Sequence, residues 1–247
     1  MKKSNWLLLV LFAAAAAGLR VRQELTGFDA AGLAIRGNLS GILLPVVLAF
    51  AAGWFAYSAR ALPARGADAA GLAEVFCFEN TAPTACAVAG AFLVLAGAAA
   101  SILYGGRSTQ TLLLAVFAMA SAVSVLYAVF ALRRGNEAQG VALLVPVCCL
   151  IVYLIFLYRA GASDPVLARI YVEILAVALL TLGALELAAF AFRVGAPRVY
   201  VPVNALAAIL AVAAASERRS PASVLLFTGC ALIELGFFAA AEFGQRK

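Results

Sequence analysis

The sequence predicts an all-α protein, a polytopic transmembrane helix bundle with about eight spans. Apolar residues make up 66% of the 247 residues and charged residues 12%, whereas soluble domains have about 45 to 50% and about 25%. The mean hydropathy of +1.04 arises from apolar runs along the whole chain, and runs of about 20 residues cross a bilayer core. We therefore predict a single integral membrane domain covering residues 1–247.

Arginine, glycine and proline divide the chain into eight apolar stretches long enough to span a membrane. These stretches are residues 5–19, 39–57, 84–105, 110–132, 140–158, 167–193, 199–216 and 222–242. The first stretch also has the basic, apolar and small-residue regions of a secretory signal peptide. We predict a retained span, and cleavage near Ala17 is the alternative.

The basic residues favour cytoplasmic termini. Ten of the 18 lysines and arginines fall on the side of the termini and eight on the opposite side. The pair Lys2 and Lys3 precedes the first span, and cytoplasmic flanks carry more positive charge than outer ones. We predict a multi-pass protein of the bacterial inner membrane with both ends in the cytoplasm.

Two loops are longer than turns. Residues 20–37 alternate apolar and charged side chains, which predicts either a short outer-surface β-hairpin or a first helix that continues to Glu24 and is followed by coil. Within residues 59–83, Leu72, Val75 and other apolar residues recur at helical spacing, which predicts a short helix on the inner surface.

The first of these loops carries the segment Leu25-Thr26-Gly27-Phe28-Asp29 followed by Gly32-Leu33. This segment resembles one in a group of uncharacterised bacterial multi-pass membrane proteins. The resemblance implies a multi-pass membrane fold, and it assigns no activity, cofactor or site residue to the chain.

The last six spans divide into two sets of three, residues 84–158 and 167–242, with similar spacing. Because each set has an odd number of spans, the second set would be inverted relative to the first. Inverted repeats are typical of transporters that bind their substrate between the two halves. A repeat of three plus three spans is therefore a prediction of the sequence.

Small residues in membrane helices allow the backbones to approach closely. The third span carries Gly97, Ser101 and Gly105 four residues apart, and the fourth carries Ala120, Ser124 and Ala128 in the same way. We predict that these two stripes face each other in an antiparallel helix pair.

Acidic side chains inside spans are costly and must face a partner or water. At 1.5 Å per residue, Glu186, Asn204 and Glu234 fall at a similar depth in three neighbouring spans, and no lysine or arginine lies near the middle of a span. Two readings are open: a proton or cation site, or interhelical hydrogen bonds with neutral glutamates. Arg169 and Glu173, one turn apart, are predicted to form an ion pair.

The residue inventory argues against an enzyme. The chain has no histidine, no glycine-rich phosphate loop, no aspartate-rich cluster and no C-x-x-C pair among its five cysteines, which removes the usual metal, haem and nucleotide sites. No lysine lies within a span to form a Schiff base. We therefore expect no catalytic activity, no cofactor and no metal.

Two functions remain for such a chain. The first is a structural or regulatory membrane subunit, which contacts the lipid bilayer and another membrane protein but no nucleic acid. The alternative is a small ion-coupled transporter, or a subunit of one, that uses the buried glutamates. A water-accessible cavity that reaches Glu186 or Glu234 would favour the transporter, because a packing role would leave both side chains dry.

Overall fold

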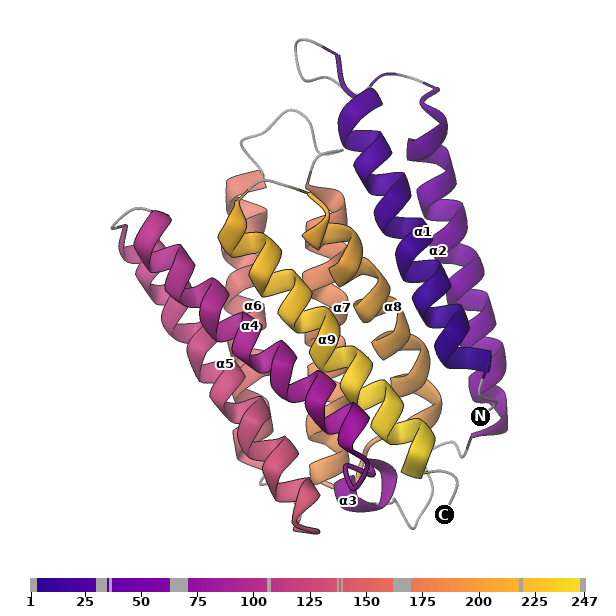
Figure 1. Ribbon diagram of the computed structural model, residues 1–247, viewed down its shortest axis with the longest axis vertical. Helices are drawn as coiled ribbons and strands as arrows, with labels where there is room; N and C mark the ends of the chain where they lie inside the picture. Colours follow the sequence, from indigo (N-terminus) through magenta and orange to yellow (C-terminus); the bar gives the residue numbers. More distant parts are fainter. Residues whose placement is uncertain are drawn as a thin grey trace.

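The computed structural model describes residues 4–29, 35, 37–62, 71–105, 108–136, 138, 140–161, 170–217 and 220–244. Eight of its helices are long and apolar enough to span a membrane, which confirms the predicted number of spans. They are α1 (Ser4–Thr26), α2 (Leu39–Ser58), α4 (Thr81–Tyr104), α5 (Thr109–Arg133), α6 (Gly140–Gly161), α7 (Tyr171–Ala191), α8 (Pro197–Ala215) and α9 (Pro221–Gly244). Both chain ends lie at the same end of the bundle (Figure 1).

Six of these helices form a closed ring. Each helix from α4 to α9 packs against the next one along the chain, and α9 returns to pack against α4. The α1 and α2 helices pack against each other and against α8, so they form a pair at the periphery of the ring (Figure 1). This order is expected where short loops connect antiparallel neighbours. The predicted division into two repeats of three spans stays a prediction.

The part of residues 20–37 that the structure describes does not support the predicted β-hairpin: it holds an isolated bridge at Phe28, and the Ile35 N–H donates to the Gly27 carbonyl at 2.8 Å. No strand is present among the described residues, and α1 continues as a helix to Thr26. The helix continues because Arg20, Gln23 and Glu24 lie on one helical face, where Arg20 binds both of the other side chains. The apparent alternation of charge in the sequence was therefore part of a helical pattern.

The closest helix contact in the ring joins α4 to α9. A Cβ atom built on Gly90 would lie 2.6 Å from the carbonyl oxygen of Gly229, and one on Gly236 would lie 2.8 Å from the backbone nitrogen of Ala87. Glycine is therefore required at these positions for the two backbones to touch. The glycines recur every seven residues, as Gly90 and Gly97 on α4 and as Gly229 and Gly236 on α9.

The predicted small-residue stripes have other neighbours than expected. The α4 and α5 helices do pack together, but Gly97 faces α9 and the Ser124 hydroxyl donates to the carbonyl of Ala142 on α6. Among the glycines of the α4 stripe, Gly105 borders Thr111 of α5. The reason is that a helix in a ring has two neighbours, and the glycines of α4 face the one that is distant in sequence.

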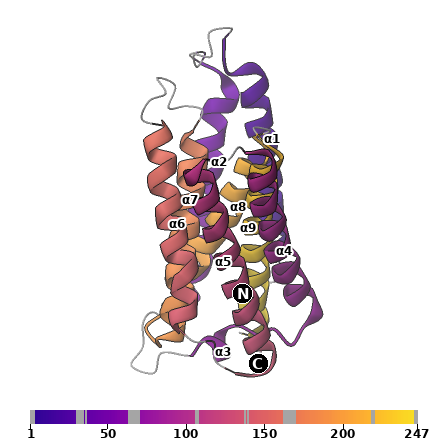
Figure 2. The ribbon, with the colours of Figure 1, turned by 90° about the vertical axis from the view of Figure 1, so that its left-hand side faces the viewer.

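The segment before α4 closes the end of the ring at which the termini lie. It contains a short 3-10 helix, η1 (Ala59–Ala61), and one helical turn, α3 (Leu72–Val75), so the predicted surface helix is much shorter than expected. Figure 2 shows α3 at this end of the bundle. Phe76, which is 1% exposed, inserts among Phe190, Tyr200 and Phe237 with ring centroids 5.2 to 5.7 Å away. We call Phe76 and these three rings the aromatic plug.

Candidate functional site

A buried polar cluster lies directly above the aromatic plug. Tyr200 and Asn204 are one turn apart on α8, which places both side chains on the helix face toward α9. The side-chain amide of Asn204 donates to the Tyr200 hydroxyl at 2.9 Å and to the Glu234 carboxylate on α9. Asn204 is fully buried and Glu234 is 9% exposed. The carbonyl oxygen of the Asn204 side chain is buried with no hydrogen-bond partner.

The structure brings together two of the three predicted site residues. Asn204 and Glu234 are in contact, but Glu186 on α7 is not among the residues that line either cavity, and its Oε2 atom is buried without a hydrogen-bond partner. The α7 residue that faces the Glu234 carboxylate is Gly183, which is close enough for an added Cβ to lie 3.6 Å from both carboxylate oxygens. Glu186 lies one turn farther along α7 and is rotated away from this direction.

A small cavity of about 70 Å³ contains the Glu234 carboxylate. It is bounded by Gly183 on α7, by Cys230 one turn from Glu234, and by Phe237 of the aromatic plug. Because Gly183 has no side chain, space remains beside the carboxylate. We call this space the inner cavity.

A larger cavity of about 250 Å³ adjoins the inner cavity inside the ring. The two share five lining residues, namely Val94, Ser121, Leu150, Leu180 and Cys230. We call the larger cavity the outer cavity. It extends toward the end of the bundle opposite the termini, where Ser101 lies in the last turn of α4 and Ser223 in the first turn of α9. The two cavities therefore lie next to each other along the ring, with Glu234 and Phe237 of the aromatic plug lining the inner one.

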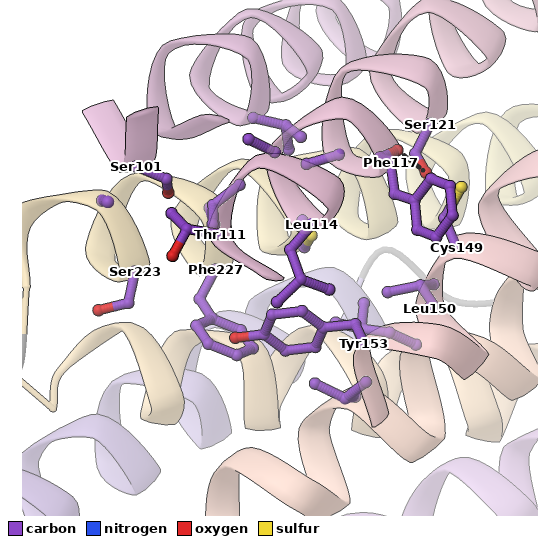
Figure 3. Close-up of a pocket in the computed structure, with 18 of the residues that line it drawn as sticks. Ser101, Thr111, Leu114, Phe117, Ser121, Cys149, Leu150, Tyr153, Ser223 and Phe227 are labelled. Atoms are coloured by element: carbon purple, nitrogen blue, oxygen red, sulfur yellow. Dashed lines mark hydrogen bonds between the residues drawn. The ribbon is translucent and has the colours of Figure 1, made fainter. Parts of the chain in front are cut away.

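The walls of the outer cavity are apolar and aromatic with a few hydroxyl groups. Figure 3 shows Tyr153 and Phe227 side by side, with Leu114 and Leu150 near them, and the two rings lie 6.5 Å apart at 72°. Among the described residues that line either cavity there is no lysine or arginine. Glu234 is the charged residue among them.

Three serine hydroxyls and the Tyr153 hydroxyl of the outer cavity have their protons engaged within the protein. Ser101, Ser121 and Ser223 each donate at 2.9 Å to the backbone carbonyl of the residue three or four positions earlier. Tyr153 donates to Glu173 at 3.1 Å. A hydroxyl oxygen that has donated its proton still carries lone pairs. The polar atoms available to a ligand here are therefore acceptors.

The predicted ion pair between Arg169 and Glu173 falls partly outside the described residues, because Arg169 is not among them. Glu173 is buried and accepts the hydrogen bond from Tyr153. A different ion pair joins the periphery to the ring. Arg20, fully buried, binds Glu217 after α8 at 2.7 Å, and its guanidinium stacks on the ring of Tyr171 at 5.6 Å.

Three features of this region were not predicted from the sequence. An arginine near the end of a span usually reaches the lipid headgroups, whereas Arg20 is buried against Glu217. Tyr153 and Phe76 were given no role at a site. The spacing of Tyr200 and Asn204 by four residues was visible in the sequence, and it could have indicated that the tyrosine hydroxyl and the amide meet.

Comparison of the chain with known protein families, with curated proteins and with solved structures gives no match. The function is therefore inferred from the cavities and the residues that line them.

Proposed function

We propose that the protein is a small ion-coupled membrane transporter, or the ion-binding subunit of one, in which Glu234 binds the coupling proton or cation. The observation that carries this proposal is the inner cavity lined by Glu234, which lies beside the outer cavity and shares five lining residues with it. A glutamate that only joined two helices would be packed on all sides. Glu234 instead lines the inner cavity together with Gly183.

The two ends of the ring differ, as expected for a transporter whose site is accessible from one side of the membrane. The cavities extend to the end opposite the termini, and the aromatic plug fills the other end. Acidic side chains inside membrane spans are costly, and they mark substrate and ion pathways in many membrane proteins. A site that faces one side of the membrane at a time is the basis of alternating access.

A structural or regulatory subunit is the second candidate, favoured by the outer face of α2. There Phe50, Trp54 and Tyr57 surround Gly53 and form a groove of about 400 Å³. Gly53 has no other atoms near its Cβ direction, so a helix of another membrane protein could approach closely here. This candidate does not require the cavities at Glu234.

The proposed orientation places both termini in the cytoplasm, so that the outer cavity faces the outside. The slight excess of basic residues on the side of the termini supports it. A reporter that is active only in the cytoplasm, fused after Lys247, should be active. A cysteine introduced at Ala31 should react with an impermeant thiol reagent added outside, and the opposite result at both positions would invert the topology.

The accessibility of the outer cavity can be tested with two neighbouring cysteines. Cys149 lines the cavity, whereas Cys148 is exposed on the outer face of α6, toward lipid. Variants with either residue as the single cysteine, reconstituted in nanodiscs, are treated with a permanently charged methanethiosulfonate. We expect modification of Cys149 and not of Cys148, because the thiolate needs water to form and react. An unreactive Cys149 would mean a dry cavity and would favour the structural subunit.

The ion-binding role of Glu234 can be tested by labelling with dicyclohexylcarbodiimide, which modifies protonated carboxyl groups in apolar surroundings. We expect labelling of Glu234 that sodium ions or a rise in pH slows, depending on the coupling ion. Glu234→Gln should lose this label, and the matched variant Glu186→Gln should keep it. Labelling that ions and pH leave unchanged would contradict the assignment.

A further inference from the structure

We propose that the ligand of the two cavities is a small lipophilic amine, bound as its ammonium form with the N–H groups on Glu234 and the apolar body in the outer cavity. This inference rests on the proposed function and names the substrate class of the same site. Three observations lead to it: the hydrogen-bonding character of the cavities, their charge, and the shape and polarity of their walls.

The hydrogen-bonding groups around the cavities call for a donor. The Glu234 carboxylate oxygens lie beside Gly183 in the lining of the inner cavity, and a carboxylate accepts hydrogen bonds. In the outer cavity, Ser101, Ser121 and Ser223 have already donated their protons to backbone carbonyls. A ligand that offers N–H groups satisfies these oxygens, whereas a ligand with only acceptors leaves buried oxygens facing each other, which is costly.

The charge of the site calls for a cation. Glu234 is the charged residue among the described residues that line the cavities, and no lysine or arginine is among them to neutralise it. An ammonium group next to the carboxylate supplies the missing positive charge and forms charge-assisted hydrogen bonds, the stronger kind. The aromatic rings of Tyr153 and Phe227 on the way to Glu234 add the attraction of π faces for a cation.

The walls call for a small apolar body. The volumes of about 250 and 70 Å³ lie below the roughly 300 to 1,000 Å³ of pockets for drug-sized ligands. Leucine, phenylalanine and tyrosine side chains dominate the outer cavity (Figure 3). An inorganic cation would leave these walls without contact, whereas the phenyl or alkyl part of a small amine covers them.

The test measures protection of Cys149, the single cysteine of a variant in nanodiscs, against a charged methanethiosulfonate. The probes are phenethylamine, whose chain ends in an ammonium at neutral pH, and 2-phenylethanol, which has the same apolar body and no charge. We expect phenethylamine to slow the modification and 2-phenylethanol to have little effect. In the Glu234→Gln variant the protection by phenethylamine should weaken by roughly ten- to a hundredfold, the value of a charge-assisted hydrogen bond.

Two controls separate a lost site from a damaged fold. Glu186→Gln, which changes a glutamate outside the cavities, should leave protection unchanged, and Gly183→Val, which fills the inner cavity, should abolish it while Glu234 is intact. Melting temperatures of all variants are measured beside the rates. If Glu234→Gln fails to fold, the amine assignment is tested by Gly183→Val alone, and protection that persists in this variant would contradict it.

The outcomes distinguish this inference from the proposed function. Equal protection by the amine and the alcohol, or none by either while Cys149 remains reactive, would overturn the amine as ligand and leave Glu234 as an ion site. An unreactive Cys149 would overturn both. Protection by the amine that depends on Glu234 and on the space at Gly183 would support both.

Discussion

Replacing Gly90 by alanine tests the backbone contact between α4 and α9. The new Cβ atom would lie 2.6 Å from the Gly229 carbonyl oxygen and 2.8 Å from the backbone nitrogen of Ile233. Both neighbours belong to the backbone of α9 and cannot rotate away, so the helices must separate by about 0.8 Å to reach an ordinary contact of 3.4 Å. A gap of this size forfeits a quarter to a half of the dispersion energy of the atoms along the seam.

The expected cost of this overpacking is about 1 to 3 kcal/mol. Alanine in place of glycine gains about 1 kcal/mol of helix propensity, so we expect Gly90→Ala to lower the free energy of unfolding by up to about 2 kcal/mol. The matched control is Gly53→Ala on α2, because a Cβ atom there meets no atom within 4 Å. Its free energy of unfolding should stay the same or rise.

The assay is equilibrium unfolding of the purified protein in mixed micelles, as the fraction of denaturing detergent increases. The control removes the effects of helix propensity and of the glycine itself. If Gly90→Ala and Gly53→Ala change stability by the same amount, then α4 and α9 are not in backbone contact, and the seam of the ring has been placed wrongly.

Two further predictions concern the ends of the bundle. Arg20→Met should lower the free energy of unfolding in the same assay by about 3 to 5 kcal/mol, the usual cost of leaving one member of a buried ion pair without its partner. Adding Glu217→Gln should recover part of this loss. Full stability of Arg20→Met would show that the pair is solvated. Phe76→Ala should cost about 3 to 5 kcal/mol by emptying the aromatic plug, and in the single-cysteine variant it should open Cys149 to a charged thiol reagent from the side of the termini. A Cys149 that stays inaccessible from that side would show that other residues close the ring.

The number and positions of the spans could be predicted from the sequence because each apolar run has the length that crosses a bilayer. The depth of Asn204 and Glu234 followed from the helical rise per residue, and the structure places them in contact. Depth alone did not show that Glu186 is absent from the lining of both cavities, since depth along a helix does not fix the direction in which a side chain points. A span rich in leucine and alanine on all faces gives little information on that direction.

Features formed between distant parts of the chain could not be predicted. Arg20 and Glu217 are separated by 197 residues, and each one alone is typical of a charged residue near the end of a span. The cavities depend on which side chains point toward the centre of the ring. Gly183 contributes to the inner cavity because it has no side chain to fill the space beside Glu234. The aromatic plug needs Phe76, from a loop, to meet three rings of α7, α8 and α9.

The seam between α4 and α9 determines which parts of the ring can move. Two helices in backbone contact behave as one rigid body. The α4 and α9 helices are the first and last helices of the ring, so their contact closes it. Glu234 and Ser223 lie on α9 and Ser101 lies on α4, so this side of the cavities keeps its shape. We expect any widening that admits or releases a ligand to come from tilting of α5, α6 and α7, which supply the opposite wall of the outer cavity. The Glu234 carboxylate therefore keeps its position, and the apolar and aromatic wall opposite it is the part that moves.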